Sequence, residues 1–367
     1  MNQHILQLCL SPDLGGLELY ALRLSTFLAP EVNLTCIVSE AGRLKGAFDK
    51  AGVPCIPIRK PPKLWPFHAA RIIAGIIDEE DIDVIHIHWT KDIPLAVLAK
   101  LLSRKKPKLV QSRHMTMTRF KGDVYHKFLY KHMDMMIAVT RQVQEQIEAY
   151  VPADVRPNVE THYIGAKTPQ PIDEGQKQAL RAQYALGTSF TVGVVARIEE
   201  GKGQYLLIDA IKQLKKQGMD VKALLVGDAM TDLYLEDLKA GLKRDGLESN
   251  IVFTGFITNV QELMQTCDVV VLPPEEETFG MVLIEAMKCG VPVIGSNRGG
   301  PLEIIEDGRS GLLFESLDSR DLADKIGYLY THGEERDQMA REGCKRASDC
   351  FDEEAQFQEM LDVLTSM

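Results

Sequence analysis

The sequence lacks several of the signals that mark common classes of protein. No apolar run approaches the ~20 residues of a membrane-spanning helix, and the start lacks a basic lead, so we expect neither a transmembrane segment nor a signal peptide. The seven cysteines are scattered, without a CxxC pair or a histidine at zinc spacing, which predicts reduced, buried thiols in a cytoplasmic protein. GxxxxGK[ST] and GxGxxG are both absent, which excludes a Walker-type phosphate loop and weakens a dinucleotide-binding interpretation.

The composition that remains is that of a globular protein with two parts. The 367 residues are 45% apolar and 26% charged, enough chain for roughly two domains of ordinary size. The net charge of -10 is unevenly distributed, because residues 1–167 carry 22 Lys and Arg against 17 Asp and Glu, whereas the rest carries 20 against 35. A mildly basic first half and a strongly acidic second half indicate two domains with different partners.

Short β-rich runs alternate with helical patterns along both halves of the chain. This alternation is typical of βαβ units and a parallel sheet, and it predicts an α/β protein of two doubly wound, Rossmann-like domains with about six strands each. A Pro-, Gly- and polar-rich linker at 165–178 separates a domain at 1–167 from one at 168–349, and a C-terminal helix within 350–367 is expected to pack back onto the first domain. Ligands of such sheets bind beyond the carboxyl ends of the strands, so we expect the site in a cleft between facing loops.

The strongest motif is DVVVLPPEEETFGMVLIEAMKCGVPVIGSNRGG, residues 268–300. A buried strand ends at its two prolines, acids follow, and a helix is predicted to begin near Thr278-Phe279-Gly280. If helical, Glu277 and Glu285 lie about 12 Å apart along the axis and on one side. Between them the free N–H groups and positive dipole end of the helix would suit a diphosphate, and the carboxylates would suit sugar hydroxyls. The alternative is a helix whose acids only favour its dipole or face solvent.

Two further motifs follow predicted strands. Arg197 and Lys202, in TVGVVARIEEGKG, are cations that suit the oxygens of a diphosphate and its charge in the transition state; the alternative is a solvated pair beside two glutamates. Gly15 and Gly16, in SPDLGGLELY, would let the backbone approach a phosphate or a sugar closely, although a plain tight turn explains them equally well.

The histidines and a DxD sequence are candidates for a second chemical centre. His114 follows a strand and is expected to face the cleft. His86 and His88 share one strand face, but no third ligand is spaced nearby, which favours core histidines over a metal site. Asp81 and Asp83 match the DxD of metal-dependent sugar transferases, yet they precede a strand, so we interpret them as a surface turn.

A basic and aromatic stretch occupies residues 100–131, with ten Lys and Arg against one acid. Such a surface would suit an anionic lipid or saccharide, whereas nucleic acid is disfavoured by the acidic total charge; the alternative is a solvated helix face. The acceptor or membrane contacts predicted from it are Lys105, Lys106, Arg113, Arg119 and Lys121.

Together, these motifs resemble the family-four (group 1) retaining nucleotide-sugar glycosyltransferases, which have the two-domain GT-B architecture. The resemblance spans nearly the whole chain and is most specific at EETFGMVLIEAMKCGVPVIGSNRGGPLEII. It implies that the first domain binds the acceptor and the second the nucleotide sugar. The roles it implies are donor-sugar contact for Glu277, ribose contact for Glu285, diphosphate contacts for Arg197, Lys202 and the backbone of Phe279, Gly280, Met281 and Val282, closure by Gly16, and a place beside the transferred sugar for His114. Pro274 and Thr278 depart from the usual Ser and Gly of the family, which affects the donor-sugar pocket more than the phosphate site.

The implied reaction is transfer of a hexose or similar sugar from a nucleoside diphosphate to an acceptor hydroxyl, with retention of configuration, no metal and no cofactor. We expect a cytoplasmic enzyme, with peripheral contact at the inner face of the membrane, that works in lipopolysaccharide or other cell-surface polysaccharide synthesis. Two alternatives stay open at this point: a nucleotide-sugar 2-epimerase of the same two-domain plan, and a non-catalytic subunit that binds sugar nucleotides. The sequence identifies neither the base, the sugar, the acceptor nor the oligomeric state.

Overall fold

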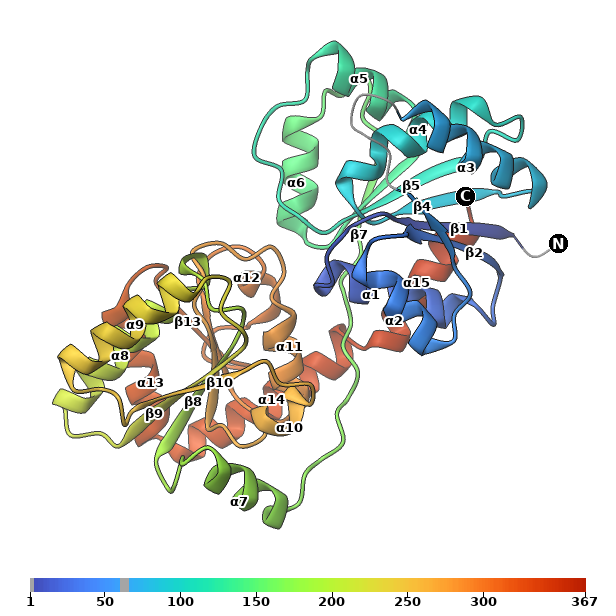
Figure 1. Ribbon diagram of the computed structural model, residues 1–367. Helices are drawn as coiled ribbons and strands as arrows, with labels where there is room; N and C mark the ends of the chain where they lie inside the picture. The colour runs from blue at the N-terminus through green and yellow to red at the C-terminus, as the bar shows by residue number, and fades with distance from the viewer. Residues whose placement is uncertain (1–2, 60–65) are drawn as a thin grey trace. The chain divides into compact units, whose positions relative to one another are not determined.

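The computed structural model describes residues 3–59 and 66–367, and the chain divides into two compact units (Figure 1). The first unit is Met1–Tyr163 together with Ala355–Met367, and the second is Ile164–Glu354. The junction therefore follows Tyr163, where the sequence placed it after Lys167, and the C-terminal segment belongs to the first unit from Ala355 onward.

A seven-stranded parallel sheet forms the centre of the first unit, in the order β3-β2-β1-β4-β5-β6-β7. This order is that of a Rossmann-like sheet with one strand added at the edge. The added strand, β7, was not among the strands expected from the sequence, because its half-exposed residues alternate too weakly to stand out. The strands are β1 His4–Cys9, β2 Asn33–Ser39, β3 Ile56–Ile58, β4 Val84–Ile87, β5 Lys108–Arg113, β6 Met135–Ala138 and β7 Asn158–Thr161.

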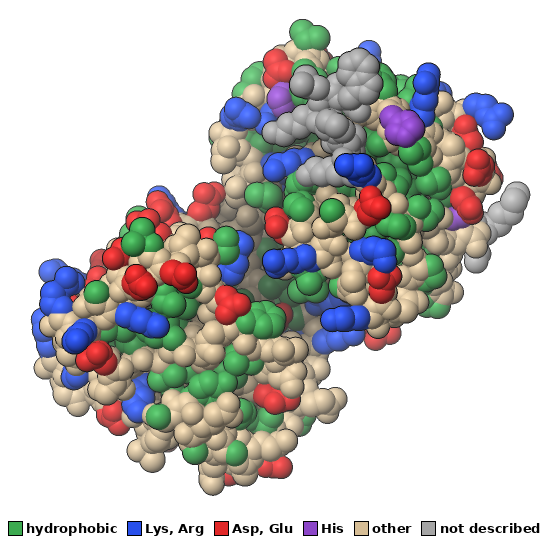
Figure 2. Space-filling model, in the orientation of Figure 1, with side chains coloured by type: hydrophobic (Ala, Val, Ile, Leu, Met, Phe, Trp, Pro, Cys, Tyr) green, Lys and Arg blue, Asp and Glu red, His purple; other side chains and the backbone are tan. Residues whose placement is uncertain are grey.

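Helices follow the strands of this sheet in turn, as expected for βαβ units. They are α1 Gly16–Leu28, α2 Arg43–Ala51, α3 Phe67–Glu79, α4 Ile93–Leu102, α5 Val124–Lys131 and α6 Arg141–Tyr150, with a short 3₁₀ turn η1 at Thr90–Asp92. The last helix of the chain, α15 (Glu353–Thr365), joins them: the ring of its Phe357 lies 5.7 Å from Tyr20 and 5.6 Å from Phe27 of α1. On the visible face of this unit, exposed hydrophobic side chains lie among Lys and Arg side chains (Figure 2).

The second unit contains a six-stranded parallel sheet in the order β10-β9-β8-β11-β12-β13, again the Rossmann order. Both doubly wound domains predicted from the alternation are thus present. The strands are β8 Phe190–Val195, β9 Val221–Val226, β10 Ile251–Gly255, β11 Val269–Leu272, β12 Val293–Ser296 and β13 Leu312–Phe314.

The helices of the second unit include one that the sequence analysis missed. The predicted linker at 165–178 gives way to helix α7 from Glu174, because Asp173 accepts from the backbone N–H of Gln176 and the Gln176 side chain accepts from that of Asp173. The helices are α7 Glu174–Gln183, α8 Gln204–Lys216, α9 Asp232–Asp245, α10 Val260–Met264, α11 Met281–Lys288, α12 Pro301–Ile304, α13 Ser319–Thr331 and α14 Gly333–Cys350, with a 3₁₀ turn η2 at Glu200–Lys202.

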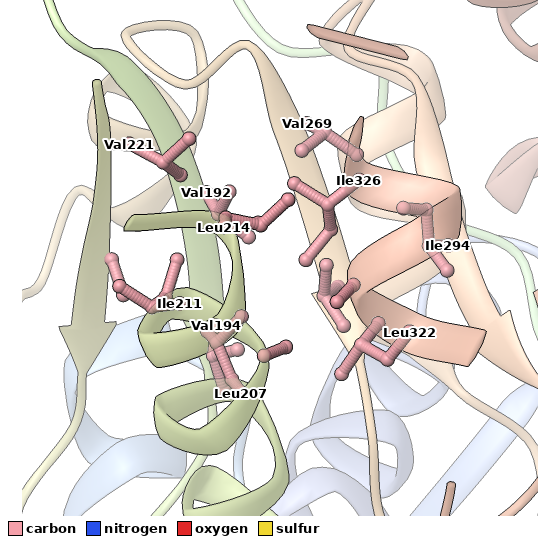
Figure 3. Close-up of a cluster of buried hydrophobic side chains, with 14 of the residues drawn as sticks. Val192, Val194, Leu207, Ile211, Leu214, Val221, Val269, Ile294, Leu322 and Ile326 are labelled. Carbon is pink, nitrogen blue, oxygen red and sulfur yellow. The ribbon is translucent and has the colours of Figure 1, made fainter. Parts of the chain in front are cut away.

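A buried apolar cluster holds α8 and α13 against the second sheet (Figure 3). Leu207 and Ile211 of α8 are fully buried, as are Leu322 and Ile326 of α13. On each helix these residues are four apart, so one stripe of the helix faces strands whose own side chains are almost entirely buried. The cluster fixes the strand ends from which the loops of the site emerge.

The strand order also shows where the chain reverses the direction in which it adds strands to each sheet, which is the topological switch point. In the second sheet β8 pairs with β9 on one side and β11 on the other, and in the first sheet β1 pairs with β2 and β4. The connections on the two sides of these central pairs run in opposite directions, and sheets of this kind bind ligands beyond the carboxyl ends of such strands, here β8 and β11, and β1 and β4.

Candidate functional site

The loops after β8 and β11 bring together two residues that the sequence analysis assigned to different motifs. The Nζ atom of Lys202 lies 3.4 Å from Oε2 of Glu277, and both side chains are partly exposed, at 28% and 21%. The two loops leave the sheet at its switch point, where doubly wound sheets bind their ligands. A cation and a carboxylate side by side at this point can contact a phosphate and a sugar hydroxyl of one ligand.

Glycine is required where these two loops meet. Gly203 follows Lys202 with φ +71°, and a Cβ atom placed there would lie 2.0 Å from the carbonyl oxygen of Pro273. The fully buried Gln204 donates from Nε2 to the carbonyl oxygen of Arg197 at 2.8 Å, which closes the β8 loop on itself. The position of Lys202 is therefore set by the backbone of both loops.

Helix α11 begins later than the sequence predicted. Its first residue is Met281 and its N-cap is Gly280, whose φ of 103° is left-handed and ends the non-helical segment. Glu277 consequently lies in the loop and not on the helix, so the helical angle between Glu277 and Glu285 does not apply. Glu285 is half-buried on the second turn, and the first backbone N–H groups of the helix lack helical partners and can receive an anion.

A second glycine contact holds the loop in front of α11. The N–H of Gly300 donates to the carbonyl oxygen of Glu277 at 2.9 Å. A Cβ atom at Gly300 would lie only 1.9 Å from the carbonyl oxygen of Phe279, so the segment after β12 packs directly on the backbone of the loop. The NRGG sequence is part of the motif, but only the structure shows what it does: Gly300 packs against the backbone of residues 277–280 and holds that loop in place.

Arg197 extends from the end of β8 with 63% of its side chain exposed, and its Nη2 lies 3.5 Å from Oε1 of Glu199. The predicted alternative, a cation beside a glutamate, thus describes its surroundings correctly, and the exposed guanidinium is still free to approach a ligand. Its Nη1 lies 3.5 Å from Sδ of Met230, which is 52% exposed. Sequence reasoning missed Met230 and the 71% exposed Phe256 after β10, two apolar side chains beyond the same edge of the sheet.

In the first unit, the predicted glycines lie at the start of α1. Gly16 is the first helical residue, and the N–H of Gly15 donates to Oε2 of Glu18 at 2.8 Å in a capping box. A Cβ atom at Gly16 would have no neighbour within 4 Å, so the backbone is open on that side. Glu18 is buried and was not singled out from the sequence.

The three histidines lie together near the carboxyl ends of β4 and β5. The rings of His86 and His88 are 4.4 Å apart, and His114 lies 5.9 Å from His88 and 4.9 Å from Tyr20. Nε2 of His86 contacts Ser112 Oγ at 2.8 Å, while that of His88 contacts Gln7 at 2.6 Å. His86 and His88 are core residues, as predicted, and the described residues contain no group of three side chains that could hold a metal.

Burial dominates the electrostatics of this histidine cluster. Loss of water around the ring, together with the neighbouring Arg113 guanidinium, lowers the pKa of His114 to about 3. Burial likewise lowers the pKa of His86 to about 3, with a smaller contribution from His114. His114 is therefore a neutral imidazole at working pH, able to donate and accept hydrogen bonds but not to act as a proton reservoir.

The basic stretch 100–131 does not form one surface, contrary to the prediction. Strand β5 runs through its middle, and the strand residues after Lys108 are buried, so the exposed cations before and after the strand are interrupted. Lys105 and Lys106 lie before the strand, at the opposite edge of the sheet from His114. Lys105 forms ion pairs there with Asp81 at 2.6 Å and Asp83 at 3.0 Å. The DxD sequence therefore precedes its strand, at the end of the sheet away from the ligand-binding loops, as predicted.

Arg113 is also misassigned by the sequence, because it is buried. It donates from Nε to the carbonyl oxygen of Met115 at 2.8 Å, from Nη2 to that of Thr116 at 2.8 Å, and from Nη1 to Thr90 at 3.2 Å. Its role is to hold the chain that follows β5. Of the five predicted cations, Arg119 is exposed and Lys121 is half-buried. The N–H of Lys121 donates to the carbonyl oxygen of Tyr150, the last residue of α6, at 2.8 Å, so the segment after β5 runs back along that helix.

The cysteines were predicted to be buried thiols, but only Cys9, Cys36 and Cys267 are buried, and the other four are half-buried. All seven cysteines are free, and burial raises the pKa of Cys9 and Cys36 to about 12, which makes their thiols poor nucleophiles. Within 3–59 and 66–367, no helix combines the length and apolarity needed to cross a bilayer.

Comparison with known proteins decides which family has this arrangement. The family model described as "Glycosyl transferases group 1" matches residues 176–346, and the model described as "Glycosyltransferase Family 4" matches residues 14–159. The chain belongs to the group 1 glycosyltransferases. Residues 14–159 lie within the first unit and residues 176–346 within the second, and the second range contains the switch-point pair of Lys202 and Glu277.

This glycosyltransferase is similar to a named relative and to solved structures. It is 28% identical over 262 residues to the N-acetyl-alpha-D-glucosaminyl L-malate synthase of Bacillus anthracis, covering 69% of this chain and 66% of the relative. Anabaena Alr3699/HepE, solved in complex with UDP, is 26% identical with a TM-score of 0.87 over 100% of both chains. The same protein was also solved with UDP-glucose, at 26% identity, a TM-score of 0.86, and 99% and 100% coverage.

Proposed function

We propose that this glycosyltransferase moves a hexosyl group from a nucleoside-diphosphate sugar to an acceptor hydroxyl with retention of the anomeric configuration. The observation that carries the proposal is the contact between Lys202 and Glu277 at the switch point of the second sheet, beside the N-terminus of α11. A diphosphate there would accept hydrogen bonds from the first backbone N–H groups of α11 and from the ammonium group of Lys202. The UDP and UDP-glucose bound to Anabaena HepE support the same class of donor here.

Each residue of the site takes a role that its surroundings permit. Glu277 accepts hydrogen bonds from hydroxyls of the donor sugar, and Glu285, one turn into α11, accepts from the ribose. Arg197 and Lys202 stabilise the charge on the leaving nucleotide, where preorganised cations contribute most to the rate. From the first unit, Gly16, which follows Gly15, offers open backbone to the donor, and the neutral His114 ring contacts the transferred sugar.

The bonds exchange on one face of the sugar. The bond from the anomeric carbon to the leaving phosphate oxygen breaks while the acceptor oxygen bonds to that carbon, and the acceptor proton passes to the phosphate. No protein nucleophile or metal is needed in this path, so positioning and charge stabilisation supply the rate. Turnover that EDTA abolishes and magnesium restores would contradict this assignment.

A panel of nucleotide sugars tests the proposal most economically. We expect one donor to raise the melting temperature of the enzyme, and NMR of the product to show the anomeric configuration of the donor. The acceptor panel should include L-malate, a soluble anionic acceptor suggested by the B. anthracis relative, together with lipid-linked glycans. An altered sugar formed without any acceptor would mean an epimerase, and donor binding without transfer would mean a binding subunit.

We also propose that the acceptor is a cell-surface glycan at a membrane. After β5 the chain exposes a run of large apolar side chains: Phe120 at 62%, Val124 at 86% and Tyr125 at 56%. The exposed Arg119 and the half-buried Lys121 stand in the same segment. Apolar side chains interleaved with cations bind the headgroup region of an anionic bilayer, because each kind of group finds its match there.

Flotation with vesicles of neutral and anionic lipid tests this contact. We expect binding to anionic vesicles, and its loss when Phe120 and Val124 are both changed to Ser. Leu233→Ser, which alters an equally exposed apolar residue of α9 in the second unit, is the matched control and should bind as wild type. Wild-type binding that depends on neither lipid charge nor these two residues would remove the membrane from the account.

A second pair of variants separates the two basic clusters. Arg119→Gln with Lys121→Gln should weaken binding to anionic vesicles. Lys105→Gln with Lys106→Gln should leave it unchanged, because the charge of Lys105 is already paired with Asp81 and Asp83. Equal losses from the two pairs would show that only the total charge matters.

A further inference from the structure

The chain passes between the two units twice, and both passages lie against helix α11. The first passage follows Tyr163 and the second precedes Ala355. They run side by side: Ala166 pairs with Asp352 in a parallel bridge, and the N–H of Ala166 donates to the carbonyl oxygen of Phe351 at 3.0 Å. Their contact is so close that a Cβ atom at Gly165 would lie 2.4 Å from Cα of Glu353.

A single buried lysine ties this paired segment to the helix of the donor site. The Nζ atom of Lys288, the last residue of α11, donates to the carbonyl oxygen of Ala166 at 2.5 Å and to Oδ2 of Asp352 at 3.1 Å. None of its side chain is exposed. An ammonium group taken out of water is costly unless its donors are satisfied, so this lysine strongly favours the arrangement in which both passages stay attached to α11.

The segment just before α11 also contacts the second passage. The ring of Phe351 lies 6.1 Å from that of Phe279, with the planes at 75°, and both residues are buried. Phe279 precedes Gly280, the N-cap of α11. The second passage thus contacts the residue before the N-cap of α11 through Phe351 and the last residue of α11 through Asp352, and Glu285 lies between the two contacts in the sequence.

We infer that Lys288 is a positioning residue of this transferase, which joins both interunit passages to α11 so that the donor-binding helix and the passages move as one body. A displacement of one passage then also displaces Glu285 and the loop at residues 277–280, and a ligand bound at that loop in turn affects the passages. The effect on turnover rests on the proposed function, whereas the mechanical attachment can be measured without any ligand.

Lys288→Met keeps the length of the side chain and removes its donors. We expect amide hydrogen exchange at 164–167 and 351–354 in the ligand-free protein to rise at least tenfold. Turnover should fall about tenfold or more in kcat, with KM for the donor within about threefold of wild type, because the phosphate contacts themselves remain. Gly165→Ala, which forces the two passages apart without touching the lysine, should reproduce both effects.

Two controls separate attachment from general stability. Lys215→Met removes a lysine that donates to the carbonyl oxygen of Gly246 and to Asn250 Oδ1, both at 2.9 Å, on the far side of α8. Leu247→Ala opens a cavity in the buried cluster of the second unit and supplies a matched loss of melting temperature. Neither control should change kcat below its melting transition or selectively raise exchange in the passages.

Several results would overturn the inference. These are unchanged exchange at both passages in Lys288→Met, raised exchange with an unchanged kcat, or the same changes in Leu247→Ala. If the wild type transfers no sugar from any donor, the proposed function fails, and the exchange data still decide whether Lys288 attaches the passages to α11.

Discussion

The substitution Gly300→Ala probes the packing that supports the loop at residues 277–280 without altering any group that is proposed to touch the donor. Gly300 has φ -55°, so alanine meets no backbone strain there, and the whole effect comes from the new Cβ atom. That atom would lie 1.9 Å from the carbonyl oxygen of Phe279, whereas real Cβ contacts essentially never fall below 3.0 Å. The loop must therefore move by about 1.1 Å relative to Gly300.

A displacement of this size has consequences for stability and for catalysis. It stretches the hydrogen bond from Gly300 N–H to the carbonyl oxygen of Glu277, now 2.9 Å, beyond bonding distance. The lost bond and the overpacking together should cost about 2–4 kcal/mol of folding free energy. Because a misplacement near 1 Å typically lowers catalysis about 100-fold, we expect kcat/KM for the donor to fall by about that factor.

Chemical denaturation and steady-state transfer assays measure the two quantities. Gly241→Ala is the matched control in the same unit, since its new Cβ atom would meet nothing closer than the end of the Arg244 side chain at 3.7 Å. The control should be at least as stable as wild type, because alanine favours a helix interior over glycine. Transfer by Gly300→Ala at the wild-type rate would refute the claim that residues 277–280 hold the donor.

Three other substitutions and one change of pH give predictions from the same structure. Glu277→Gln and Lys202→Ala should each lose most turnover while circular dichroism and melting temperature stay near wild type; wild-type rates would refute their roles. Arg113→Met should lower the free energy of unfolding by about 2–4 kcal/mol, because it leaves two backbone carbonyl oxygens without their donor, and should not act through lipid binding. Acid should destabilise the first unit between pH 6.5 and about 3, because the pKa values of His86 and His114 are lowered on folding and the unfolded chain takes up protons first.

The sign and size of the acid effect can be checked directly. Each of these two histidines contributes a loss of up to about 1.4 kcal/mol per pH unit as the pH falls through that window. Denaturant titrations at pH 7, 6 and 5 measure it above the range where the carboxylates protonate. Stability that stays flat over this range would mean that the histidine rings are hydrated.

The fold was predictable because its pattern is repeated. Buried strands followed by amphipathic helices recur along both halves, and the order of the strands then follows the Rossmann rule. The elements that the sequence analysis missed are short or weakly patterned, such as β7, whose residues are half-exposed, and α7, whose apolar periodicity is poor. The capping box at Asp173 and Gln176 was the available signal for α7.

The site was predictable as far as residue type and strand position decide it. Arg197, Lys202 and Glu277 follow strands that turned out to flank the switch point. The helical geometry assigned to Glu277 and Glu285 was wrong, because a left-handed Gly280 delays the helix. The single basic surface was wrong because the stretch passes through β5, whose residues after Lys108 are buried, Arg113 among them. Contacts between distant segments, such as those of Gly300 and Lys288, leave no local signature in the sequence.

A crystal structure of the enzyme with an intact nucleotide sugar tests the central claim most directly. We predict that the diphosphate lies within hydrogen-bonding distance of the backbone N–H groups at Gly280–Val282 and of Lys202 Nζ, with the ribose on Glu285 and the sugar on Glu277. A donor bound elsewhere, with this loop and helix end facing only solvent, would contradict the account.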